Sequence, residues 1–172
     1  MSGLQPITRS SQLSVEVVWL SAADGVLRYR SEAHPLDGGV HPDDAAWHVS
    51  GLTLCTPGAL LHSTSWRYAR GSVVLTYVAL PDPDPHDTVA VPTDAVTSGG
   101  GPLHPSPAVI PIEAVAAHAC RHLALLAVTD PQVAAVAAAE SPLWTLITKL
   151  PCAPAGTLHP AQTTATAPHT AC

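Results

Sequence analysis

Six consecutive residues, His62 to Arg67, combine an imidazole, three hydroxyls, an indole and a guanidinium. Most of their neighbours are hydrophobic, which predicts a β-strand whose successive side chains point to opposite faces. Ser63, Ser65 and Arg67 would then share one face, which could form the wall of a ligand pocket. Trp66 would lie on the other face and anchor the strand in the core. The simpler interpretation, which we favour, is a half-exposed strand whose hydroxyls face water, as antiparallel sheets often contain.

Two histidines four residues apart, His118 and His122, would lie on one face of a helix. This spacing suits metal ligation, but the zinc-protease pattern needs a glutamate where this chain has Ala119. No Cys-x-x-Cys pair or obvious acidic ligand accompanies the histidines. We therefore expect no metal site, and in particular no tight zinc site. A closed pocket joining His62, Ser65 or Arg67 to the helix edge at His122 would favour ligand binding, whereas an open sheet face would favour protein interaction.

Four of the six arginines fall in predicted strands or their turns, namely Arg28, Arg30, Arg67 and Arg70. Arg28 and Arg30 are two residues apart and would share a strand face. Guanidinium groups on a rigid strand are suited to bidentate contact with a carboxylate or phosphate. Our hypothesis is a small anion held by Arg67 together with Arg28 or Arg30. The competing interpretation, which is the more common case, is a solvated face with Leu27 and Tyr29 pointing inward.

Other groups with metal-binding chemistry are arranged unfavourably. Asp82 and Asp84 alternate with prolines that stiffen the backbone, and the glycine and glutamate of a calcium loop are missing. We interpret this stretch as a solvated linker. The four cysteines form no Cys-x-x-Cys pair, and we expect them to be free thiols.

The elements that position these residues follow from the hydrophobic periodicity. It predicts an antiparallel sheet of five strands and then two or three helices, an α+β fold. The last three strands would form a meander over 51–80, and 32–49 a loop with a helical turn near 43–47. Asp130-Pro131 and Ser141-Pro142 are helix-start signals. The strands are expected at 14–21, 25–31, 51–56, 60–68 and 72–80, with a short addition at 88–91, and the covering helix at 111–128.

The length of 172 residues suits one domain. We expect a flexible N-terminus over 1–13, an α+β domain over 14–150 with a Pro- and Gly-rich loop at 81–110, and a disordered tail over 151–172. A net charge of −6 argues against a nucleic-acid partner. No apolar run approaches the roughly 20 residues of a membrane span, and no secretory signal is visible, so a cytoplasmic location without membrane contact is expected.

The chain contains no Walker A loop, no dinucleotide-binding glycine pattern and no nucleophile elbow. Strands followed by late helices are loosely similar to the back half of a Nudix domain, although the Nudix box and its magnesium ligands are absent. Our leading hypothesis is binding, or turnover, of a small anionic metabolite or nucleotide on the sheet face. The alternatives are a non-catalytic protein-interaction or accessory protein and a Nudix-like domain without its box. The residues do not indicate a cofactor, a reaction or a protein partner.

Overall fold

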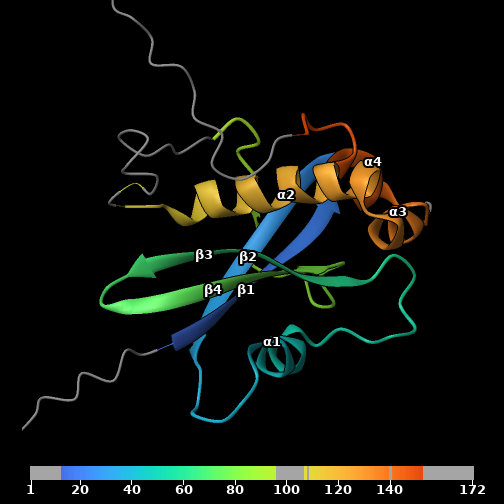
Figure 1. Ribbon diagram of the computed structural model, residues 1–172. Coiled ribbons are helices and arrows are strands. Elements are labelled where there is room, and N and C mark those ends of the chain that lie inside the picture. The colour runs from blue at the N-terminus through green and yellow to red at the C-terminus, as the bar shows by residue number, and fades with distance from the viewer. Residues whose placement is uncertain (1–12, 96–106, 108, 140, 153–172) are drawn as a thin grey trace, which may run out of the picture.

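The computed structural model describes residues 13–95, 107, 109–139 and 141–152. A five-stranded sheet with the order β3-β4-β1-β2-β5 forms the middle layer (Figure 1). Helices α2, α3 and α4 lie on one side of it and α1 lies on the other, so the fold is α+β. The strands are β1 (Leu13–Ala23), β2 (Val26–Pro35), β3 (Leu60–Ala69), β4 (Ser72–Leu80) and β5 (Val89–Ala90), and the helices are α1 (Pro42–Ser50), α2 (Ile112–Thr129), α3 (Pro131–Ala137) and α4 (Pro142–Ile147).

The central strand β1 is buried on both faces, which explains its nearly continuous hydrophobic sequence. Val18 and Leu20 point into a core shared with α2, α3 and α4. Val15, Val17 and Trp19 point into a second, smaller core beneath α1. The two faces of the sheet are therefore distinct environments, and a residue's position along its strand decides which one it enters.

The expectation of a wholly antiparallel sheet is wrong at one pair of strands. β1 runs antiparallel to β2, and β3 antiparallel to β4, but β4 lies beside β1 in parallel. The two hairpins are joined through α1, which covers the side of the sheet opposite α2 (Figure 1). β1 lies between β2 and β4, and the larger core on one side of the sheet and the smaller core on the other cover its two apolar faces.

The expected meander over 51–80 is in fact the β3–β4 hairpin preceded by turns. Residues 51–59 form no strand, because Gly51 ends α1 with a φ of 66° and Leu52 packs into the smaller core. The segment 32–49 is likewise more ordered than a loop. β2 continues to Pro35, and α1 begins at Pro42 with His41 as its N-cap.

A three-residue loop at 69–71, as the sequence predicts, would place Trp66 opposite Val74, Thr64 opposite Thr76 and His62 opposite Val78. The β3–β4 register differs from this expectation in the second half of β3. A two-residue turn, with positive φ at Arg70 and Gly71, replaces the expected three-residue loop. A bulge at Thr64 then restores the expected pairing of His62 with Val78. Between the bulge and the turn, the pairs are Ser65 with Thr76, Trp66 with Leu75 and Arg67 with Val74.

The helices on the larger core begin where the sequence predicts. Asp130 accepts hydrogen bonds from the backbone of Gln132 and Val133, and Ser141 accepts one from Trp144. Alanines on the buried face of α2 allow this helix to approach the sheet closely. Among the described residues, α2 alone is long and apolar enough to cross a membrane. However, 44% of its residues are buried within the protein, and they supply much of the core. Most of the expected C-terminal tail, from residue 153 onward, lies outside the described residues.

Candidate functional site: a histidine cluster between a strand and a helix

Three histidines from two elements meet on the α2 side of the sheet. The ring of His62, on β3, stacks on that of His122 with centroids 5.6 Å apart and an interplanar angle of 24°. His118, one turn earlier on α2, stacks on His122 at 5.9 Å and 30°. The i, i+4 spacing places both helix histidines on the face that meets β3. His122 is thus the middle ring of a stack that bridges the two elements.

Burial lowers the pKa of all three imidazoles, which favours their neutral forms. For His62 the nearby charge of Asp130 partly opposes this effect. For His118 a hydrogen bond to the Thr64 backbone opposes it, whereas the positive charge of Arg121 adds to it. For His122 the proximity of the other two histidines lowers the pKa further. At neutral pH the cluster therefore carries little charge.

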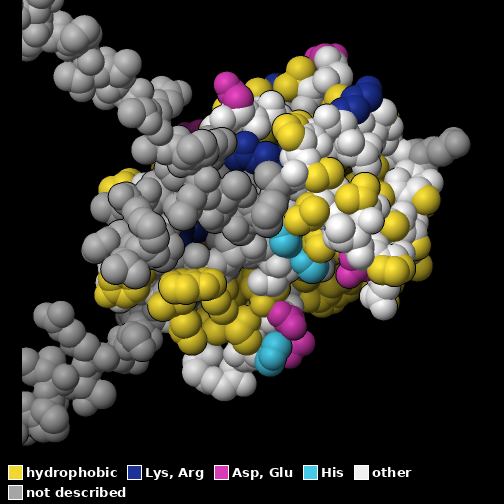
Figure 2. Space-filling view, turned by 45° about the horizontal axis from the view of Figure 1, so that its top comes forward, with side chains coloured by type: hydrophobic (Ala, Val, Ile, Leu, Met, Phe, Trp, Pro, Cys, Tyr) yellow, Lys and Arg dark blue, Asp and Glu magenta, His cyan; other side chains and the backbone are white. Residues whose placement is uncertain are grey.

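Two nitrogens of the cluster lack hydrogen-bond partners. Within the part of the chain that the structure describes, Nε2 of His118 and Nδ1 of His122 are buried and unpaired. Buried polar groups are usually satisfied, so these two nitrogens are an unfavourable feature that a hydrogen-bond partner would relieve. Figure 2, which turns the α2 side toward the viewer, shows histidine side chains reaching the surface among hydrophobic, uncharged and acidic groups.

Arg67 lies on the same face as His62 but is engaged with a buried carboxylate. Its two terminal nitrogens each donate to Glu16 at 2.7 Å. Thr76 donates to Glu16 at 3.3 Å and accepts from Arg67 at 3.1 Å. Glu16 is only 5% exposed. This bidentate pair uses the geometry that an anionic ligand would need.

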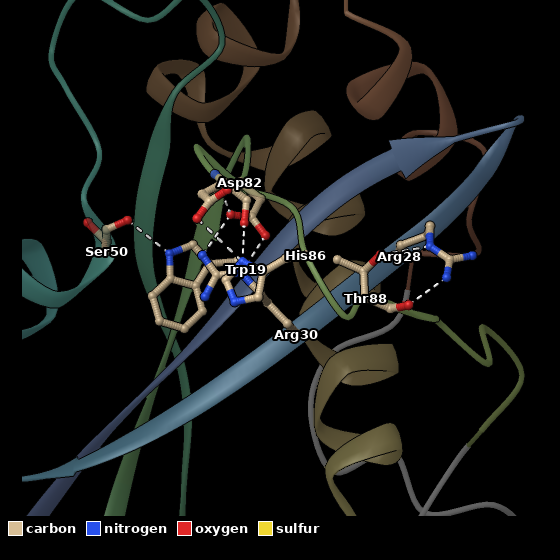
Figure 3. Close-up of polar contacts among 8 residues, drawn as sticks. Trp19, Arg28, Arg30, Ser50, Asp82, His86 and Thr88 are labelled. Carbon is tan, nitrogen blue, oxygen red and sulfur yellow. Dashed lines mark hydrogen bonds and ion pairs between the residues drawn. The ribbon is translucent and has the colours of Figure 1, made fainter.

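Arg28 and Arg30 share a face, as predicted, with Leu27 and Tyr29 on the opposite, buried one. Arg30 forms a bidentate pair with Asp82, both contacts being 2.8 Å, and lies 4.0 Å above the ring of Trp19 (Figure 3).

The segment after β4 is solvent-exposed over 83–87, as expected from its prolines, but contacts at both of its ends attach it to the sheet. Asp82 is 8% exposed and also accepts a hydrogen bond from the Asp84 backbone. Thr88 accepts from Arg28, and β5 pairs with β2 directly afterwards (Figure 3). These contacts attach the segment to the sheet on the side of α1, the side to which Trp19 points.

The structure brings together only some of the candidate residues named from the sequence. His62, Ser65 and Arg67 share the α2 face of the sheet, where His122 also lies. Ser63 does not, because the bulge at Thr64 changes the alternation and leaves it opposite Tyr77 of the smaller core. Arg28 and Arg30 also lie on the α1 side, so neither joins Arg67.

The role of two residues of the site, His118 and Glu16, was not predicted from the sequence. His118 was considered only as a zinc ligand, although its spacing from His122 already placed both on one helix face. Glu16 stands alone among the hydrophobic residues of β1, and a lone carboxylate in a buried strand indicates a paired charge. Within the described ranges, no group of three or more histidine, cysteine, aspartate or glutamate side chains is arranged to hold a metal ion.

Comparison of the chain with protein-family models, with curated proteins and with solved structures found no match. The candidate function therefore depends on the geometry of the site itself.

Proposed function

We propose that this domain binds a small anion, such as the phosphate or carboxylate group of a metabolite or nucleotide, at the cluster of His62, His118 and His122. The observation that carries the proposal is the pair of buried nitrogens on His118 and His122 that have no partner among the described residues. An anionic oxygen would accept a hydrogen bond from either nitrogen in its protonated form. The unpaired buried nitrogen, which destabilises the fold, would then form a charge-assisted hydrogen bond.

The histidines suit this role better than the arginines. Glu16 and Asp82 already neutralise Arg67 and Arg30 through bidentate pairs, so a ligand would have to displace a carboxylate from each. Within the described ranges, no carboxylate is paired with the three imidazoles, so a ligand would displace none from them. An anion would also favour their protonated forms, so binding should take up protons and become tighter as the pH falls towards 6.

Thermal unfolding of the full chain with inorganic phosphate, pyrophosphate and citrate tests the proposal at pH 6 and pH 8. A ligand that binds only the native state must raise Tm. We expect a larger increase at pH 6 than at pH 8, and its loss in His122→Gln. His48→Gln is the matched control, because His48 is exposed on α1 across the sheet, and it should respond like the parent protein.

Two results would contradict this placement of the site. No increase in Tm with any of the three anions at pH 6 would exclude the proposed binding. An increase retained in His122→Gln but lost in Arg67→Gln would move the site to Arg67, as first inferred from the sequence.

A second candidate function, self-association, is favoured by the exposed side chains of β3. This strand lies at the edge of the described sheet, where its outer backbone groups can pair with another strand. Trp66 and Tyr68 are 66% and 69% exposed. β3 contains no Lys, Asp, Glu or Pro, and its single charge, on Arg67, is neutralised by Glu16. A second copy of the chain could therefore pair with this edge without like-charge repulsion.

Sedimentation velocity over a hundredfold concentration range tests this candidate. Concentration-dependent dimerisation that Trp66→Lys abolishes would support it, because a lysine on an edge strand opposes pairing. Val89→Lys, an exposed position on the opposite edge strand β5, is the matched control. A monomer at every concentration would exclude self-association through β3.

A further inference from the structure

We propose that the three-histidine cluster is an acid-sensitive latch, which holds α2 against β3 while the imidazoles are neutral and releases this contact when they are protonated. The inference goes beyond anion binding, because it depends on the geometry of the ligand-free protein.

The geometry makes the contact sensitive to charge. The three rings form one continuous stack. The ring centroids of the outer histidines, His62 and His118, each lie within 5.9 Å of the ring centroid of His122. His62 belongs to the edge strand and the other two to the helix, so the stack lies across the junction of α2 with β3. Protonation of any two neighbours would place two positive charges at this spacing in a partly buried site, where screening by water is weak.

The surrounding charges do not compensate for three protons. Asp130, at the start of α3, acts on His62 and favours its protonated form. Arg121, on α2, acts on His118 and disfavours protonation. On β3, Arg67 is already paired with Glu16 and leaves no net charge nearby. Among the described groups, one carboxylate therefore faces up to three imidazolium groups and a guanidinium, which gives an excess of positive charge.

The rest of α2 is held against the sheet by side chains that do not change their protonation between pH 5.0 and 7.5. Leu123 and Cys120 are fully buried in the larger core, and burial raises the pKa of the Cys120 thiol to about 12. Asp130 follows α2 directly and caps α3. Acid should therefore loosen the edge of α2 that faces β3 before it unfolds the domain.

The direction of the pH dependence follows from the lowered pKa values. The folded state holds fewer protons on these histidines than the unfolded or opened state does, so protons favour opening. The contact is complete above the ordinary histidine pKa of about 6.5 and is lost as the pH falls below it towards the lowered values.

Hydrogen exchange of the full chain, in buffers free of phosphate and carboxylates at pH 7.5, 6.0 and 5.0, tests the latch. After correction for the intrinsic pH dependence of exchange, we expect protection of β3 and of α2 near 118–122 to fall at least tenfold between pH 7.5 and 5.0. Protection of the β1–β2 hairpin should stay constant. His122→Gln removes the middle ring and should flatten the response of β3, whereas His48→Gln should leave it unchanged.

Three results would overturn the latch. One is a uniform loss of protection across the sheet, and another is an unchanged response in His122→Gln. The third result applies even if that variant fails to fold. It is an NMR titration of the parent protein in which none of the three histidines has a pKa below the ordinary value of about 6.5. Because the buffers contain neither phosphate nor carboxylates, failure of anion binding would leave this test unaffected.

Discussion

At the scale of single residues, the sheet is crossed by charged pairs that connect distant parts of the chain. Glu16 and Arg67 are 51 residues apart, and their side chains are 7% and 15% exposed. Their bidentate contact compensates for removing both charges from water. Removal of one partner leaves the other charge buried without compensation, whereas replacement of both by apolar groups need not destabilise the fold.

Glu16→Ala should therefore lower the free energy of unfolding by about 3 kcal/mol, within the range for breaking a buried pair. The double variant Glu16→Leu, Arg67→Met should lie within about 1 kcal/mol of the parent protein, because no unpaired charge remains. Urea unfolding of Glu16→Ala, of the single variants Glu16→Leu and Arg67→Met, and of the double variant measures these values. Additive losses would show that the two side chains are not energetically coupled.

At the scale of elements, two tryptophans distinguish a buried anchor from an exposed side chain. Trp144 of α4 is 2% exposed and donates from Nε1 to the Gly58 carbonyl at 3.1 Å. Trp66 of β3 projects from the sheet. Trp144→Ala should cost about 3–5 kcal/mol of unfolding free energy, and Trp66→Ala about 0.5 kcal/mol or less. Comparable losses in urea unfolding would place Trp66 in the core, as the sequence had suggested.

Asp130 has two separable roles at the junction of α2 and α3. Its carboxylate caps α3, and its charge favours protonation of His62. Asp130→Asn retains a capping acceptor and should change stability by only a few tenths of a kcal/mol, whereas Asp130→Ala should cost about 1 kcal/mol. Both variants should lower the pKa of His62 further. Urea unfolding and NMR titration of His62 measure the two effects, and equal stability losses would contradict the capping role.

At the scale of the whole molecule, the described residues form a sheet with a core on each face, and the chain up to Cys152 supplies both cores. The residues beyond it are mainly Ala, Thr, Pro and His, with one large hydrophobic residue, Leu158. A chain ending at Cys152 should unfold within about 2 °C of the full chain, because little apolar area is removed. A larger decrease in Tm, measured by calorimetry, would mean that this segment stabilises the domain.

The sequence by itself determined the features that depend on neighbouring residues. The Asp24-Gly25 turn, the strands around it and the caps at Asp130 and Ser141 each follow from a few adjacent side chains. The mixed α+β class follows as well, because the hydrophobic period changes from two to that of a helix along the chain.

Only the tertiary structure decided what these elements bring together. The parallel pairing of β4 with β1 places β1 in the middle of the sheet, between the two cores, and no local pattern encodes this strand order. The bulge at Thr64 reassigned Ser63 to the other face. The same strand register places Arg67 beside Glu16 and His62 against α2. Contacts between residues distant in sequence depend on strand order and register, which arise from the burial of all elements at once.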